Sequence, residues 1–558
     1  MHHFEIKAKR HVAFLLVIVL LLSALAMFSA CGNAESQGTA GKTDATEAPT
    51  SPAETPTEAP EGTTADPGTE PAATSSPEAG TTAAATTEAG TTAGPVSTAA
   101  VTTANDSTTA AATTAAATTA AVTTQPAPVT TAPVVTTVPV TTEAPKPVDS
   151  TALVARDGWA LDIPAYPYGT LDTKKYNCGQ GLTEADPTAY MQIVSSTTAK
   201  DFQNYVLALK DAGYLAEQEN AVDGNLFASL YDGTHRMYCY YLNYYRQVKV
   251  ISDPVSVSVK DFDFKPVSAP AAEGPVMYAY GFNSTGQILL IHNTDGSWFI
   301  NDGCTSSLDS EALWQFLLSK SNLAAGEKLR VSLWYITHGH SDHFPGVYNM
   351  MKKHSAEISL ERCMWNFPDQ GVIQPGSSSR KPQLEMQTWV KQTYPNVLYL
   401  KPHNGMTVTA GDFSLFFMAT QEDNVPQFLS GEYNDYNNTS AVCMMTFCGK
   451  KVFLPGDSKQ ATIDGDGFMC KIYSDSTLVC QMMQVSHHGY NKMKTLHQKF
   501  YPTLEFAIYM NTYDESVGKN SGSSKAILDK LGEAKCCWSD KTYAFTVKDG
   551  KFVRTVIE

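Results

Sequence analysis

Hydrophobic and polar positions follow three different patterns along the chain. A continuous apolar run fills residues 12–28, and residues 32–150 carry almost no large apolar side chain. From residue 151 onward, short apolar runs with helical or alternating spacing take over. Because 558 residues with such changes exceed one usual domain, we expect several parts. The predicted boundaries are 1–31, 32–150, 151–270 and 271–558.

Residues 151–270 have the pattern of a small α+β accessory module. Apolar side chains at helical spacing predict a helix over 198–212. Runs over 225–231, 235–243 and 247–252 predict strands, with a hairpin turn between the first two. No catalytic constellation is visible here. A group of tyrosines suggests a ligand platform, although tyrosine is equally a normal strand residue. This group consists of Tyr238, Tyr240, Tyr241, Tyr244 and Tyr245.

Residues 271–558 alternate strand and helix patterns, which is typical of an α/β fold. Strands over 286–293 and 297–301 form a predicted hairpin, and a helix is predicted over 308–319. The run RVSLWYIT at 330–337 predicts a short buried strand. All the candidate chemistry of the chain lies in this part.

The N-terminal run has the features of an export signal. Basic residues precede it, and Ser29-Ala30-Cys31 follows it. This ending resembles the lipobox of bacterial lipoproteins, which implies that Cys31 carries lipid and that the chain is cut before it. The alternative is an uncleaved membrane anchor, although a spanning helix needs ~20 apolar residues. Both interpretations place the remaining chain outside the cytoplasmic membrane, lipid-anchored or secreted by a bacterium.

Residues 32–150 account for much of the net charge of the chain, so this charge says little about the folded part. This Thr-, Ala- and Pro-rich stretch cannot bury enough surface to fold, so we predict a disordered linker. Its span would be roughly 60 Å, which suits a tether through a cell wall. Most of the formal net charge of −16 belongs to this part. The C-terminal half is close to neutral and has no strong nucleic-acid signature.

The motif THGHSDH follows the predicted strand at 330–337. It places His338, His340, Asp342 and His343 within six positions. Imidazole and carboxylate are standard ligands of zinc and similar ions. Two metals ~3.5–4 Å apart can share a water and lower its pKa. The motif therefore predicts a metal site at the end of a strand.

In two later segments, an apolar run is also followed by residues of metal-ligand type. Asp457 ends KVFLPGD, where it could bridge two metals. His487 and His488 follow the run QVS. We expect one of the two histidines to be a ligand and the other to lie behind it, and the sequence leaves open which is which.

These motifs resemble those of the metallo-β-lactamase superfamily over roughly 275–558. HGHSDH matches its HxHxDH signature, Asp457 its bridging aspartate, and Asp302 its strand-ending Asp-Gly. The resemblance implies an αββα sandwich with metals at one edge of the two sheets. The order NNTS, FLPGD and HHG is most similar to the hydrolase domain of ComEC-type competence proteins. No further run of membrane-spanning length follows, so DNA uptake itself is not implied.

The chain departs from that pattern between the first motif and Asp457. Many dinuclear members have another histidine there, but only His354 and His403 occur, and both are expected to be surface residues. Asn438 lies nearer the expected place, as a second-layer residue together with Asp302. The first metal would then have only His338, His340 and Asp457, and could be manganese. After HHG, Lys492 or Lys494 could meet a substrate phosphate or remain solvated.

The predicted function is hydrolysis by a metal-bound hydroxide, with one or two zinc ions or manganese. Asp342 and Asp457 are the expected catalytic carboxylates, and a phosphodiester of nucleic acid or wall polymer is the preferred substrate. Alternatives are a surface binding protein with a structural metal and, less favoured, a β-lactam or ester hydrolase. Many of the other cysteines are expected to be packed thiols, among them Cys304, Cys443, Cys448 and Cys480.

Overall fold

The computed structural model describes residues 155–557, except 256, 261–267, 370–373, 375–376, 431–434, 460–466, 491–494 and 520–522. The predicted export signal with Cys31, the predicted linker at 32–150, and both Lys492 and Lys494 lie outside the described residues. Among the helices in the described ranges, none combines the length and hydropathy needed to cross a bilayer. The described residues all belong to one compact unit of the chain.

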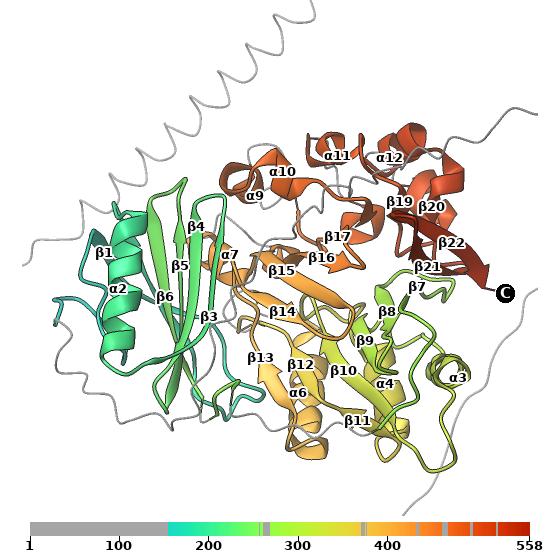
Figure 1. Ribbon diagram of the computed structural model, residues 1–558, viewed down its shortest axis with the longest axis horizontal. Coiled ribbons are helices and arrows are strands. Elements are labelled where there is room, and N and C mark those ends of the chain that lie inside the picture. Colours follow the sequence, from blue (N-terminus) through green and yellow to red (C-terminus); the bar gives the residue numbers. More distant parts are fainter. Residues whose placement is uncertain are drawn as a thin grey trace, which may run out of the picture. The chain divides into compact units, whose positions relative to one another are not determined.

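The accessory module is a six-stranded antiparallel sheet with one helix on one face (Figure 1). Its strand order is β1-β2-β6-β5-β4-β3. The strands are β1 (Thr170–Asn177), β2 (Tyr190–Ser195), β3 (Leu215–Val222), β4 (Asn225–Tyr231), β5 (His235–Leu242) and β6 (Gln247–Pro254). The helix α2 (Ala199–Asp211) begins at a capping box, in which Thr198 and Asp201 satisfy each other's backbone N–H groups. The predicted helix and three strands are thus confirmed.

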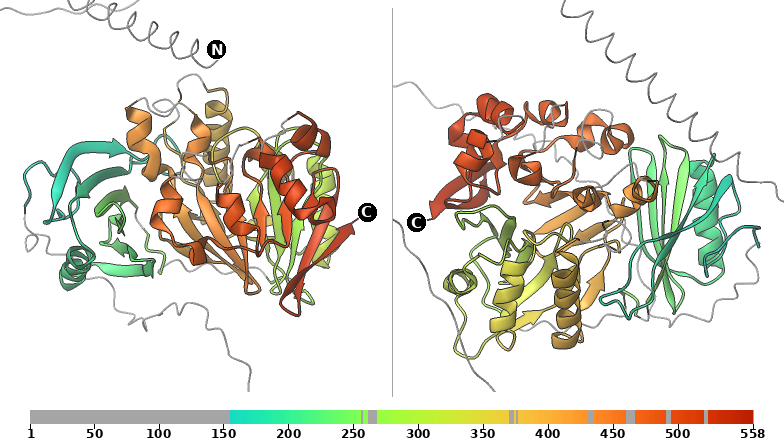
Figure 2. Two further views of the ribbon diagram at one scale, coloured as in Figure 1. Left: turned by 90° about the horizontal axis from the view of Figure 1, so that it is seen from above. Right: turned by 180° about the vertical axis from the view of Figure 1, so that it is seen from behind.

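The rest of the chain forms two further sheets that face each other (Figure 2). One has nine strands in the order β13-β12-β10-β9-β8-β7-β21-β22, with β11 beside β10. The other has seven, in the order β14-β15-β16-β17-β18-β19-β20. The first comprises β7 (Val276–Ala279), β8 (Ile288–His292), β9 (Trp298–Asp302), β10 (Leu329–Tyr335), β11 (Ile358–Leu360), β12 (Arg362–Met364), β13 (Leu398–Leu400), β21 (Thr542–Lys548) and β22 (Lys551–Ile557). The second comprises β14 (Thr407–Thr409), β15 (Phe413–Ala419), β16 (Val442–Phe447), β17 (Lys450–Leu454), β18 (Met482–Gln484), β19 (Phe506–Ile508) and β20 (Cys536–Cys537).

Helices cover the outer faces of both sheets. Apolar side chains of α3 (Ser310–Ser321), α4 (Pro345–Lys353) and α6 (Arg380–Thr393) pack on the nine-stranded sheet. The other sheet meets α11 (Thr495–Phe500), where the rings of Phe453 and Phe500 lie 5.1 Å apart. The remaining helical segments are α7 (Gln421–Leu429), α9 (Phe468–Ile472), α10 (Asp475–Leu478), α12 (Ser523–Leu531), η2 (Tyr436–Thr439), η3 (Ser486–Gly489), η4 (Asp514–Lys519) and η5 (Glu533–Lys535).

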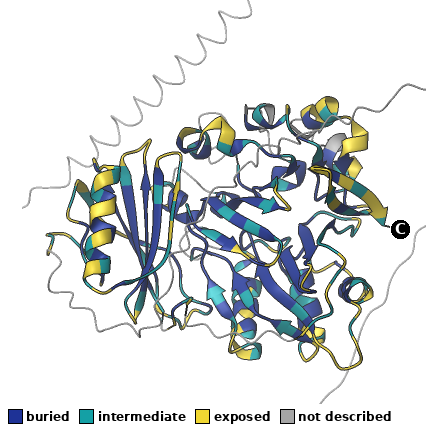
Figure 3. Cartoon of the chain, in the orientation of Figure 1, coloured by how far each residue is buried: buried dark blue, intermediate teal, exposed yellow. Residues whose placement is uncertain are grey.

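The two sheets share an apolar core between them. The rings of Phe299 and Phe413 lie 4.4 Å apart across it, and those of Tyr335 and Phe417 lie 5.5 Å apart. Burial follows the same layers, with dark strands inside and exposed helix faces outside (Figure 3). The predicted αββα sandwich is therefore confirmed.

Parallel pairing brings the ends of four strands to one edge. Strands β9 and β10 are parallel neighbours in one sheet, as are β17 and β18 in the other. Carboxyl ends of parallel strands lie at the same edge, so the loops after them meet. Backbone hydrogen bonds tie these loops together, from Ala441 N to Thr337 O (2.9 Å) and from His487 N to Gly456 O (3.1 Å).

The accessory module packs directly on the sandwich through the sheet face opposite α2. Tyr238 and Tyr240 lie on this face and belong to the same apolar core as the two large sheets. Tyr241 packs under α2 instead. Only Tyr244 and Tyr245 of the tyrosine group are exposed, at 60% and 39%. The three buried tyrosines are packing residues, so the group does not form one ligand platform.

Of the two histidines predicted to lie on the surface, His403 is buried and His354 is half-buried. His403 is 1% exposed, with its ring 3.8 Å from that of Tyr238, so the prediction of a surface residue was wrong. The module covers the turn that carries it. His354 does lie at the end of α4, half-buried against the ring of Trp314.

The ten described cysteines are all free thiols. Cys443 and Cys480 are buried in strands and loops of the sandwich, as predicted. Cys448 is exposed, which the sequence prediction missed. It follows directly after β16, in the turn that leads to β17, where its φ is 48°.

Candidate metal centre

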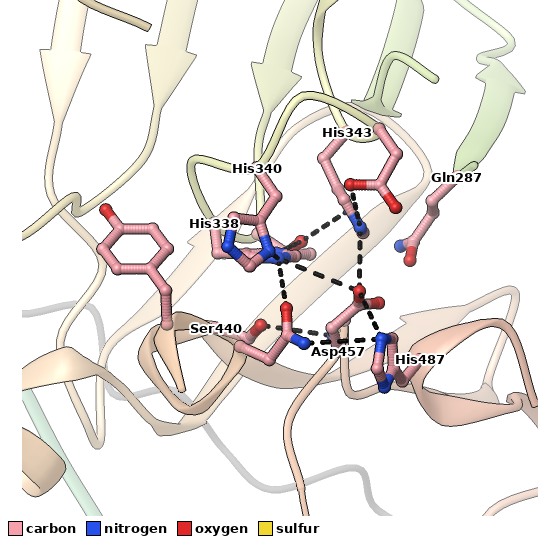
Figure 4. A network of polar contacts seen from close by, with 12 residues as sticks. Gln287, His338, His340, His343, Ser440, Asp457 and His487 are labelled. Atoms are coloured by element: carbon pink, nitrogen blue, oxygen red, sulfur yellow. Dashed lines mark hydrogen bonds and ion pairs between the residues drawn. The ribbon is translucent and has the colours of Figure 1, made fainter. Parts of the chain in front are cut away.

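The loops after β10, β17 and β18 place histidines and aspartates around one point (Figure 4). The Oδ2 atom of Asp457 lies at the centre. His343 Nε2 is 3.2 Å from it and His488 Nε2 is 3.4 Å from it. His338 Nε2 and His487 Nε2 are farther away, at 3.8 and 3.9 Å. Each sequence motif therefore contributes to a single cluster.

We call Asp342, His343, Asp457 and His488 the inner ligand set. One ligand atom from each lies within 4.8 Å of all the others. Atoms bound at about 2.0–2.2 Å to one zinc in a tetrahedron are roughly 3.4 Å apart, so the spacing is suitable for a metal. Three of the four side chains are buried, and that of Asp342 is 33% exposed.

We call His338, His340 and His487 the outer ligand set, which shares Asp457. His338 Nε2 lies 3.0 Å from His340 Nδ1 and 3.0 Å from Asn437 Oδ1. The amide nitrogen of Asn437 lies 3.4 Å from His487 Nε2. The outer set is thus built around the side chain of Asn437.

Both histidines of the HHG segment reach the cluster because of an unusual backbone. His487 and His488 have φ values of 51° and 54°, in the left-handed region that non-glycine residues seldom occupy. Such residues cost of order 1–3 kcal/mol each and cluster at functional sites. His488 Nδ1 donates to Met510 O at 3.1 Å, which turns its Nε2 toward the inner set.

Asp302 orients His343 from behind. Its Oδ2 lies 3.1 Å from His343 Nδ1, and its carboxylate also accepts from Thr337 N (2.6 Å) and Thr337 Oγ1 (3.0 Å). A carboxylate behind a ligand histidine fixes the ring and the tautomer that faces a metal. Burial raises the pKa of Asp302, although His343 opposes this.

The acids and imidazoles of the inner set stabilise one another's charged forms. Burial alone would raise the pKa of Asp457, but His488 and His343 hold it well below its usual range. Burial would lower the pKa of His488, but Asp457 and Asp342 raise it to about 9. Positive charge is therefore favoured beside Asp342 and Asp457, as a bound cation would require.

The imidazoles of the inner set face carboxylates. His343 Nε2 lies 3.2 Å from Asp457 Oδ2, and His488 Nε2 lies 3.3 Å from Asp342 Oδ2. Because these ligand-type atoms converge on one point, a divalent metal ion would fit between them, and the inner set suits zinc by ligand type.

Other predicted site residues lie near the cluster without facing it. Asn438 accepts from Lys459 N at 3.3 Å, so the amide beside the histidines is Asn437, not Asn438. Cys304 is a packed thiol, and burial raises its pKa to about 12.

Sequence reasoning also missed buried polar residues around the cluster. Gln287 donates to Asn301 Oδ1 at 3.2 Å and accepts from Gln484, which ends β18. Asp457 N donates to Ser440 Oγ at 3.2 Å. The sequence signal was present, since Gln484 interrupts an apolar strand and Ser440 ends the NNTS segment.

Comparisons with known proteins give only distant likenesses to solved structures. No protein-family model and no curated protein matches the chain. Solved structures that match include the metallo-beta-lactamase fold protein YhfI from Bacillus subtilis, at 13% identity over 38% of this chain and 70% of that one, with a TM-score of 0.23. Human tRNase Z, short form, matches at 13% identity over 38% and 76%, with a TM-score of 0.22. CmlA, a diiron beta-hydroxylase from Streptomyces venezuelae, matches at 10% identity over 68% and 77%, with a TM-score of 0.30. Likenesses this distant carry no information about the reaction.

Proposed function

We propose that this chain is a metal-dependent hydrolase of the metallo-β-lactamase superfamily that cleaves phosphodiesters outside the cytoplasmic membrane. One observation carries the metal-dependent part. Two buried imidazole Nε2 atoms, of His343 and His488, converge on the carboxylates of Asp342 and Asp457 where parallel strands end. Imidazole and carboxylate gathered in this way are the ligand types of zinc.

The residues of the inner set have separate tasks in this proposal. A divalent metal ion held by these residues would lower the pKa of a bound water and stabilise developing negative charge. His343 and His488 are held in place by Asp302 and by the carbonyl of Met510. Asp342 has the most exposed side chain of the set, at 33%, so it would be the ligand on the side that solvent and substrate reach.

The substrate class and the location rest on the sequence. The order of NNTS, FLPGD and HHG is similar to that of ComEC-type hydrolase domains, which supports a phosphodiester. The export signal supports a place on the outer face of a bacterial membrane, where nucleic acid or a wall polymer would be available. Zinc is the preferred metal, and manganese is the alternative.

Metal content and hydrolysis, measured together on the purified whole chain, test this proposal. The assay uses bis(p-nitrophenyl) phosphate with zinc, with manganese, and after chelation. We expect Asp457→Ala to lose metal and at least about 10²-fold in kcat/KM, because the centre loses its shared ligand. Asp211→Ala, which removes an exposed acid at the end of α2, is the control and should match the parent.

Two outcomes would contradict the proposal in different ways. Bound metal without turnover of any ester would favour a binding protein with a structural metal. Absence of bound metal would remove the metal centre itself.

A further inference from the structure

The two ligand sets differ in the groups that face their imidazoles. In the inner set, His343 Nε2 and His488 Nε2 face the carboxylates of Asp457 and Asp342, at 3.2 and 3.3 Å. In the outer set, His338 Nε2 has two partners at 3.0 Å, Asn437 Oδ1 and His340 Nδ1. His338 is therefore hydrogen-bonded by neutral groups without a metal.

Asn437 occupies the place between the outer histidines. Its Oδ1 faces His338 and its Nδ2 faces His487, at 3.0 and 3.4 Å. Because an amide oxygen only accepts, the proton of this hydrogen bond belongs to His338 Nε2. A nitrogen that carries this proton has no lone pair for a metal.

The backbone holds Asn437 in this position. Asp435 caps the short helix η2 by accepting from Asn437 N at 3.0 Å. The side chain is 6% exposed, so it has little room to turn toward solvent. The amide is thus a built feature of the site, with both of its ends engaged.

We propose that the centre binds one zinc ion tightly, in the inner ligand set, and that Asn437 prevents the outer set from binding a second with similar affinity. This inference rests on the proposed metal centre. Neutral amide oxygen is a weak ligand for zinc compared with imidazole, thiolate or carboxylate. Replacing this one amide by a carboxylate should therefore create the second site.

The test is a zinc titration of the whole chain with metal content after dialysis, for the parent, Asn437→Asp and Asn438→Asp. The parent should retain one equivalent. Asn437→Asp is isosteric and should retain two, with at least tenfold tighter binding of the second equivalent. Asn438→Asp is the matched control, because that side chain bonds Lys459 N instead, and it should retain one.

Several results would overturn the inference. The inference is wrong if the parent holds two zinc ions with equal affinity, and also if Asn437→Asp retains only one zinc ion. A second equivalent in Asn438→Asp would show that added charge alone is sufficient. If Asn437→Asp does not fold, Asn437→Ser decides, because removing the amide should also strengthen the second equivalent. A parent without zinc would refute the metal centre itself, which metal content shows independently of activity.

Discussion

His343 illustrates how one carboxylate behind a ligand controls the site. Asp302 is fully buried, and its Oδ2 lies 3.1 Å from His343 Nδ1. In Asp302→Asn, we expect metal affinity to fall about 10–100-fold, because the ring loses the charged partner that fixes its tautomer. Competition with a chelator measures this. Asp295→Asn, on the same hairpin but bonded to Arg330, is the control. Unchanged affinity in Asp302→Asn would contradict this role.

Single residues also show what the sequence could and could not predict. His338, His340, Asp342 and His343 were predictable because they share one short segment. Asn437 contacts His338 across 99 positions of sequence. His403 lies in a polar turn, KPHNG, which the sequence predicts to be exposed. In the fold, its ring packs against Tyr238, which is distant in the sequence. Local pattern thus predicts ligands within one loop, whereas the neighbours of a side chain depend on the tertiary fold.

Among the elements, the turn after β17 sets the position of Asp457. Gly456 has a φ of 55°, and a Cβ there would lie 2.9 Å from Thr337 Cβ. We expect Gly456→Ala to lower the free energy of unfolding by about 1–3 kcal/mol through backbone strain and crowding. Bound metal should decrease as well, because Asp457 moves. Urea unfolding with metal analysis measures both.

Gly274→Ala is the matched control for that substitution. A Cβ there meets nothing within 4 Å, and the φ of Gly274 is not in the left-handed region. We expect a change within about 0.5 kcal/mol. Equal effects of the two substitutions would mean that the turn at Gly456 is not strained.

Element prediction succeeded where periodicity was strong and local. The predicted helix over 198–212 corresponds to α2, and the predicted strand over 330–337 corresponds to β10. The hairpin of β21 and β22 was not predicted, although it extends the nine-stranded sheet beside β7. Register between such distant strands depends on core packing, which no local pattern records.

Over the whole molecule, buried charges join the accessory module to the sandwich. Lys249 pairs with Asp423 at 2.7 Å, and Lys401 pairs with Asp253 at 2.8 Å, all nearly inaccessible to solvent. Leaving one partner of such a pair alone costs about 3–5 kcal/mol, so these contacts disfavour separation. We therefore regard the module as part of the same folding unit as the sandwich, and not as a freely moving targeting domain.

Glu422 makes this interface sensitive to acid. Burial alone would raise its pKa, but His403, whose Nδ1 lies 3.1 Å away, together with hydrogen bonds from Asn366 and Thr420, holds the pKa below the ordinary 4.5. A group whose pKa is lower in the folded state stabilises the fold above its unfolded pKa. That contribution is lost as pH falls through the lower, folded value. Stability should therefore decrease below about pH 4.5.

Glu422→Gln tests this dependence in the whole chain. The variant keeps the shape and an acceptor for Asn366 but cannot titrate, so its Tm should vary less with pH below 4.5 than that of the parent. Near neutral pH it should be less stable, because the partner of His403 is no longer charged. Glu327→Gln, an exposed acid that caps a surface turn, is the control. If Tm falls with pH in the same way for the parent and for Glu422→Gln, Glu422 is not the source of acid sensitivity at the interface between module and sandwich.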